Sequence, residues 1–140
     1  MVFSEMNYYA AKYISSANLQ YYLKNNIFEL KGSVPKDSHF DALFSEIQIG
    51  DVLILWNNVQ VTNETIVKGY AYIKAIYPVE RVLRVQEWTQ FPNAGLNINS
   101  IKWSRDRQLQ KIGEIDLDTL SANSSEFHLV MTMPPDDYFS

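Results

Sequence analysis

The sequence predicts an α+β fold, a small, curved, mostly antiparallel β-barrel of about six strands with two or three helices. An apolar run over residues 51–56 lies between turn-forming residues, which is the pattern of a buried strand. Over residues 66–77 the sequence alternates, with Val67, Ala71 and Ile73 on one face. Residues 81–88 supply a third extended run. No crossover helix separates these three runs, so they form an antiparallel meander.

The flanking elements follow from caps and periodicity. Residues 7–14 predict the first strand, and Ser15 and Ser16 offer a capping hydroxyl to a helix over residues 17–25. A short extended piece is expected over residues 27–31, and a second helix from Ser38. After the meander we expect a polar loop over residues 89–99, strands over 100–104, 109–115 and 126–133, and one helical turn over 116–120.

The length of 140 residues suits one domain with a real core. We predict a single domain over residues 1–133, with residues 134–140 as a tail or the start of a linker, because Pro134 and Pro135 stop the last strand. There is no Cys, which excludes disulfides and thiolate metal sites and suits a cytoplasmic protein. The sequence shows no signal peptide and no apolar run long enough for a membrane span.

The net charge of −4 is unevenly distributed. Up to Lys111 there are twelve Lys and Arg against ten Asp and Glu, a net charge of +2, and the remaining six acids follow without any Lys or Arg. A mildly basic body with an acidic end permits a small basic face. It is not the composition of a strong, non-specific DNA-binding protein.

Catalytic motifs are absent from the sequence. The two histidines, His39 and His128, stand beside a helix cap and within an apolar strand pattern, and no GxSxG, HExxH, Walker or GxGxxG motif occurs. Asp116 and Asp118 near a helical turn are typical of solvated charge. We therefore expect no enzymatic activity, no catalytic residues, no metal and no cofactor.

The remaining candidates for a functional site are a set of aromatic residues near predicted bends and a basic segment. Trp56 and Trp88 lie at the ends of predicted strands, where a sheet can present a ring to a cleft, whereas Trp103 lies mid-strand and is expected in the core. The segment SIKWSRDRQLQK, residues 100–111, holds four cations against one acid. Cations beside an aromatic suit a phosphate backbone next to a stacked base.

Several segments in this order resemble the PUA-like superfamily and, within it, the EVE and YTH domains. The resemblance covers residues 7–115. It is carried by the segments AAKYISS, NIFELKG, IGDVLILW, IVKGYAYI and SIKWSRDRQL. Phe28 stands where these families commonly have Trp.

The resemblance implies a non-catalytic module that binds DNA or RNA and holds a modified base between aromatic rings. EVE-like domains of this kind are similar to readers in restriction and defence proteins, so further domains of a longer chain are expected as well. The alternative is a protein-interaction or regulatory domain of the same fold without a base ligand. The implied base pocket comprises Lys12, Tyr13, Phe28, Trp56, Trp88 and Phe91. The implied contacts to the nucleic-acid backbone are Lys31, Lys102, Arg105 and Arg107. In this interpretation, Trp88→Ala weakens binding and leaves the thermal midpoint nearly unchanged.

Overall fold

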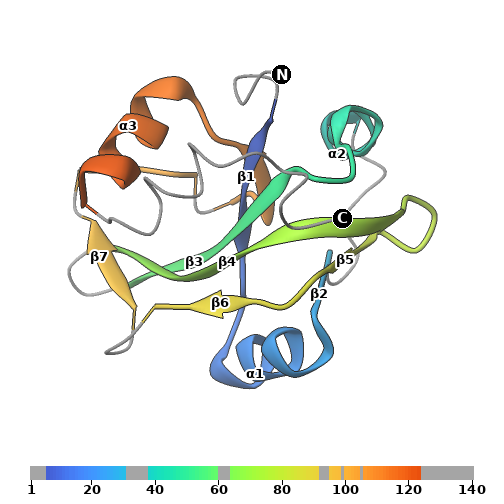
Figure 1. Ribbon diagram of the computed structural model, residues 1–140, viewed down its shortest axis with the longest axis horizontal. Coiled ribbons are helices and arrows are strands. Elements are labelled where there is room, and N and C mark those ends of the chain that lie inside the picture. Colours follow the sequence, from blue (N-terminus) through green and yellow to red (C-terminus); the bar gives the residue numbers. More distant parts are fainter. Residues whose placement is uncertain are drawn as a thin grey trace.

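The computed structural model describes residues 6–30, 38–59, 64–91, 95–98, 100–104 and 106–123. Their elements are shown in Figure 1. In chain order they are β1 (Tyr8–Lys12), α1 (Ser16–Asn25), β2 (Ile27–Glu29), α2 (Ser38–Glu46), β3 (Val52–Val59), β4 (Glu64–Tyr77), β5 (Val82–Val85), β6 (Thr89–Gln90), β7 (Leu96–Ile98), β8 (Leu109–Lys111) and α3 (Glu114–Asn123). None of the helices in these ranges is long and apolar enough to span a membrane.

The strands form one curved sheet in the order β2-β5-β4-β3-β1-β8, with β6 and β7 also paired to β4. All pairs are antiparallel except β1 with β3. The predicted α+β class, the mostly antiparallel curved sheet and the meander of β3, β4 and β5 are confirmed. Among the described strands β2 and β8 end the order, so the sheet is open and the barrel does not close.

The first strand lies inside the sheet. β1 runs parallel to β3, with Tyr8 opposite Val52 and Lys12 opposite Trp56, and antiparallel to β8, with Ala11 opposite Leu109. A parallel pair needs a long connection, which α1, β2 and α2 supply here. The carboxyl ends of β1 and β3 therefore meet the start of β8 at one end of the sheet.

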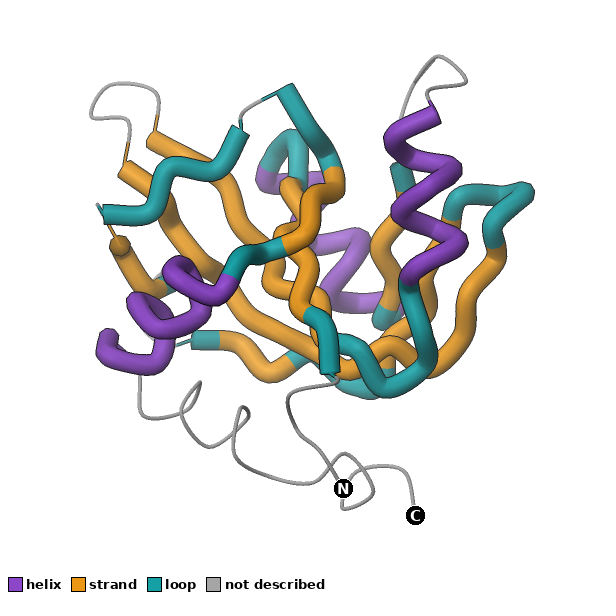
Figure 2. Tube along the Cα trace, turned by 90° about the horizontal axis from the view of Figure 1, so that it is seen from above, coloured by secondary structure: helices purple, strands orange, loops and turns teal. Residues whose placement is uncertain are grey.

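The sheet buries side chains on both faces. The first core lies against α1 and α2, and the second lies on the α3 side, with α2 and α3 on opposite sides of the strands in Figure 2. Along β1, Tyr9 and Ala11 face the first core, whereas Tyr8 and Ala10 face the second. Because successive side chains of a strand point to opposite faces, β1 contributes residues to both cores.

The first helix is capped at both ends, close to its predicted bounds. The hydroxyl of Ser15 accepts a hydrogen bond from the backbone N–H of Asn18 at 3.1 Å, which caps α1. Asn26, in the left-handed conformation with φ of 54°, ends the helix. Leu19 and Tyr22 are the buried residues of α1, and their side chains pack in the first core. α2 begins at Ser38 as predicted, and its C-terminal half packs in the first core.

A β-bulge corrects the predicted faces of β4. Leu55 pairs with Gly69 and Trp56 with Val67, so Lys68 is an extra residue in β4. Because a bulge inserts one extra residue into the strand, the side chains beyond it point to the opposite face of the sheet from the one that strict alternation predicts. Val67 consequently joins the second core, whereas Ala71 and Ile73 belong to the first. The prediction of one shared face was wrong at Val67.

Other differences from the predicted strand boundaries involve segments that pair with β4. β3 continues to Val59, past the expected stop at Asn57 and Asn58, because these residues pair with Ile66 and Thr65. The predicted loop over residues 89–99 contains β6 and β7. Each forms ladder hydrogen bonds with β4 that no local sequence pattern announces.

The C-terminal expectations had mixed outcomes. Residues 100–104 are not a strand, although Ile101 is buried and its carbonyl accepts a hydrogen bond from the Thr65 hydroxyl at 2.7 Å. The expected helical turn is part of the longer α3. The predicted strand over 126–133 and the tail over 134–140 lie outside the described residues.

One buried carboxylate joins β1 to the turn before β3. Asp51 accepts hydrogen bonds from the backbone N–H of Asn7 at 3.1 Å and of Gln48 at 2.9 Å. Burial raises the pKa of Asp51 above its usual value of 3.8, although both hydrogen bonds and the charge of Lys111 act in the opposite direction. Desolvation therefore outweighs the stabilisation of the charged form.

This sign predicts an unusual pH dependence. The folded state binds the Asp51 proton more tightly than the unfolded state, so the stability that Asp51 contributes increases as the pH falls through its folded pKa towards 3.8. Urea unfolding of wild type and Asp51→Asn at pH 7 and pH 4.5 isolates this contribution. The difference in free energy of unfolding should shift in favour of wild type at the lower pH. A constant difference, or a shift towards the variant, would contradict the raised pKa.

Candidate functional site

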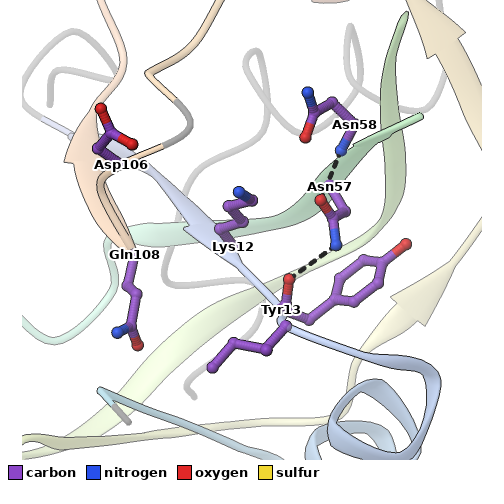
Figure 3. A pocket seen from close by; sticks show the side chains of 7 residues that line it. Lys12, Tyr13, Asn57, Asn58, Asp106 and Gln108 are labelled. Carbon is purple, nitrogen blue, oxygen red and sulfur yellow. Dashed lines mark hydrogen bonds between the residues drawn. The ribbon is translucent and has the colours of Figure 1, made fainter. Parts of the chain in front are cut away.

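A pocket of about 370 Å³ opens where β1 and β3 end and the chain approaches β8. Figure 3 shows the side chains around it. It is lined by Lys12, Tyr13, Ile14, Asn57, Asn58, Asp106 and Gln108. We call it the Lys12 pocket. Its three walls come from segments that are distant in the sequence and adjacent in the sheet.

The register of β1 positions Lys12. Lys12 continues the face of Tyr8 and Ala10, lies opposite Trp56, and donates its backbone N–H to the carbonyl of Gln108 at 2.9 Å. Its ammonium nitrogen is 5.8 Å from the centroid of the Trp56 ring, within the range of a cation–π interaction. The ammonium is thus held at the pocket while a buried ring lies behind it.

Asn57 positions the opposite wall. Its side-chain amide donates to the Tyr13 carbonyl at 2.9 Å, and its side-chain oxygen accepts from the backbone N–H of Asn58 at 2.7 Å. The dashed lines in Figure 3 mark both hydrogen bonds. Tyr13 in turn donates its N–H to the Trp56 carbonyl at 3.1 Å. Asn57 therefore fixes the end of β3 against the chain leaving β1.

The pocket combines complementary polar groups. Lys12 is a cation and Asp106 an anion, and the carboxamides of Asn58 and Gln108 each carry donors and acceptors. Burial raises the pKa of Tyr13, so its hydroxyl stays neutral at neutral pH. Such a lining can pair with a flat heterocycle that presents donors and acceptors along one edge. In the ranges that the structure describes, no three His, Asp or Glu side chains are grouped to hold a metal ion.

Two of the six residues predicted for the base pocket line the Lys12 pocket, namely Lys12 and Tyr13. The ring of Tyr13 packs mainly in the first core. Its backbone carbonyl accepts the hydrogen bond from Asn57 at the pocket.

Phe28 and Trp88 lie elsewhere. Phe28 is fully buried, with its ring centroid 5.3 Å from that of Tyr22. Trp88 is 6% exposed, and its indole N–H donates to the Tyr22 carbonyl at 3.0 Å. Both residues belong to the first core. Neither residue lines the Lys12 pocket, and their contact with a base stays a prediction.

Trp56 and Phe91 belong to the other side of the sheet. Trp56 is 1% exposed and meets Trp103 edge to face at 5.2 Å, which confirms the expected core position of Trp103. Phe91 packs against the second core, 5.9 Å from Tyr70 between ring centroids. The five predicted aromatic residues are thus divided over the two cores, whereas Lys12 lines the pocket.

The predicted contacts to the nucleic-acid backbone stay a prediction. Lys102 and Arg107 are exposed, whereas Lys31 and Arg105 lie outside the described residues. The same basic segment contributes Asp106 and Gln108 to the Lys12 pocket. Sequence reasoning missed these two residues together with Ile14, Asn57 and Asn58. The two asparagines were interpreted only as turn residues, because the pairing of β1 with β3 leaves no local signal.

Comparison with known proteins gives one informative similarity. No family model matches the chain, and no curated protein matches its sequence. Among solved structures, the crystal structure of the Pho92 YTH domain in complex with m6A is similar, with a TM-score of 0.51 and 14% sequence identity. The match covers 92% of this chain and 88% of the other.

The chain has a YTH-like fold. The expected resemblance to YTH domains is therefore confirmed at the level of the fold. A YTH-like fold is an α+β arrangement of a curved sheet with helices, and it places the Lys12 pocket at one end of that sheet.

Proposed function

We propose that this chain is a non-catalytic nucleic-acid-binding module that accepts a single base in the Lys12 pocket. The observation that carries the proposal is the lining of this pocket, in which an ammonium stands beside carboxamides and a carboxylate. The YTH-like fold supports it, because the similar Pho92 domain was crystallised in complex with m6A.

The chemistry of the pocket suits a nucleotide. Its volume of about 370 Å³ is near the lower end for small-ligand sites, which suits a single base. Asn58, Gln108 and Asp106 match the donors and acceptors of a base edge, and Lys12 matches the adjoining phosphate. Lys102 and Arg107, both exposed, are our candidates for further phosphate contacts.

A modified base is the ligand that we favour. The apolar side chain of Ile14 lines the pocket beside the polar groups and can contact a methyl group. One buried carbon contributes about 0.8 kcal/mol, or about a fourfold preference. Extruding a base from a duplex costs a few kcal/mol, so single strands should bind more tightly. The resemblance to EVE domains supports a role as the reader domain of a restriction or defence protein.

Replacing Lys12 tests the site. Lys12→Ala should weaken binding of pentameric RNA and DNA strands about tenfold or more, because a charge-assisted hydrogen bond is removed. The strands carry a central m6A nucleotide or unmodified adenine, and fluorescence anisotropy gives the affinities. Lys74→Ala is the matched control, since Lys74 is an exposed lysine on β4, away from the pocket lining.

Replacing Arg107 tests the phosphate contacts separately. Arg107→Ala should weaken binding of the modified and unmodified strands equally, because a phosphate carries no information about the base. Anisotropy titrations at several salt concentrations should show a salt dependence that is flatter by about 0.7 for each phosphate that Arg107 neutralises in wild type. An unchanged slope would show that Arg107 is only a solvated charge.

Two results would count against the proposal. Equal affinities of Lys12→Ala, Lys74→Ala and wild type would remove the Lys12 pocket as the base site. A wild-type protein that binds none of the strands in low salt would favour the alternative of a protein-interaction domain.

A further inference from the structure

A second hollow adjoins the Lys12 pocket. It has a volume of about 390 Å³ and is lined by Ile14, Ser15, Ala17, Asn18 and Tyr21. We call it the α1 groove, because four of its residues belong to α1 or its cap. Ile14 lines both hollows, so the α1 groove continues the Lys12 pocket across one side chain.

The α1 groove is apolar and firmly held. Ile14 is 57% exposed and Tyr21 is 45% exposed, so both side chains present apolar surface to solvent. The backbone N–H of Ile14 donates to the side-chain oxygen of Asn18 at 2.8 Å, and Asn18 is itself bonded to the Ser15 hydroxyl. The Tyr21 ring stands on the helix with its centroid 6.2 Å from that of Tyr22. The two hydrogen bonds fix the chain from Ile14 to Asn18, and the exposed Tyr21 ring lies on the following turn of α1.

The charge around the α1 groove favours a polyanion. The chain contains 16 Asp and Glu, yet none of them lies within residues 6–28. The only charged side chains of that stretch are Lys12 and Lys24. Lys12 lines the adjoining pocket, and Lys24 is exposed in the last turn of α1, three residues beyond Tyr21. This stretch of chain therefore supplies two cations and no carboxylate to repel phosphate, and Asp106 lines the adjoining pocket together with Lys12.

We propose that the α1 groove binds the base next to the one in the Lys12 pocket, stacked on Tyr21. The ligand is then a single strand of at least two consecutive nucleotides, with phosphates near Lys12 and Lys24. This inference rests on the proposed function and extends it to the neighbouring nucleotide. Stacking on an exposed ring requires an uncovered base face, which a single strand offers and a duplex does not. A strand also accounts for the continuity of the two hollows, since its adjacent bases are joined covalently.

The test removes one base without removing a phosphate. Three pentamers share the central nucleotide that wild type binds best, and two of them have an abasic site immediately 5′ or 3′ of it. Wild type should bind one abasic pentamer about 5- to 150-fold more weakly than the intact strand. Tyr21→Ala should bind the intact strand more weakly by a similar factor, and the same abasic site should cost this variant nothing further.

Two variants control for the structure. Tyr21→Phe keeps the ring and should bind like wild type, and Tyr77→Ala removes a tyrosine that is 40% exposed at the far end of β4. The second base site would be overturned if Tyr21→Ala bound the intact strand with wild-type affinity. It would also be overturned if the abasic site weakened the binding of this variant as much as that of wild type. In either case weaker binding by Lys12→Ala would leave the proposed function standing. Failure of wild type to bind any pentamer would remove both.

Discussion

Replacing Trp88 with alanine is expected to lower the free energy of unfolding by about 3–5 kcal/mol, enough to reduce the thermal midpoint by about 10 °C. The indole is 6% exposed and packs in the first core. Its N–H donates to the Tyr22 carbonyl at 3.0 Å, which also accepts from the backbone N–H of Asn26, so truncation leaves a cavity and removes one of the two hydrogen bonds of that carbonyl. A domain of this size has a total stability of about 5–15 kcal/mol, so the expected decrease is a large fraction of it.

Thermal and urea unfolding of two variants separate the causes. Trp88→Phe fills most of the cavity and removes only the hydrogen bond, so it should fall between wild type and Trp88→Ala. Tyr77→Ala, at a 40% exposed position, should unfold close to wild type. An unchanged midpoint for Trp88→Ala, together with weaker nucleic-acid binding, would return Trp88 to the ligand surface that its sequence position indicated.

Gly69→Ala is expected to lower the free energy of unfolding by about 1–3 kcal/mol, because the added methyl group would overlap neighbouring atoms. A Cβ at this position would lie 2.5 Å from the carbonyl oxygen of Thr89 and 3.3 Å from the Cα of Gln90. Both atoms are backbone of β6, which pairs with β4 at this point. No change of rotamer relieves such a clash, so β6 must move away from β4.

Gly113 provides the matched control for Gly69→Ala. A Cβ at Gly113 meets nothing within 4 Å, so Gly113→Ala should be neutral or slightly stabilising. Urea unfolding of both variants gives the comparison. Equal stabilities would show that β6 adjusts freely. Hydrogen exchange should also reveal faster opening at Phe91, whose N–H bonds the Lys68 carbonyl beside Gly69.

The parts of the fold that were predictable are those with a local cause. The extended segment over residues 66–77 and the Ser15 cap depend only on neighbouring residues, and both are present in the structure, the first within β4. The bulge at Lys68 was not predictable, since it becomes visible only in the pairing with β3. The short strands β6 and β7 likewise exist because β4 is long enough to pair with them.

The candidate site was predictable only where it follows β1. Lys12 was found from its motif, but Asn57 contacts Tyr13 across 44 residues of sequence. Trp88 was expected at a cleft because it lies at the end of a predicted strand. The strand ends at Val85, so alternation no longer applies at Trp88 and its ring turns into the first core.

The central position of β1 has a consequence for biosynthesis. β1 leaves the ribosome first among the strands, yet one of its edges is paired only when residues 109–111 have been made. Until then it is an exposed edge open to the wrong partner. The same late segment supplies Asp106 and Gln108 to the Lys12 pocket. A nascent chain therefore pairs the last of the described strands and completes the lining of the Lys12 pocket at the same stage of synthesis, before α3 has been made.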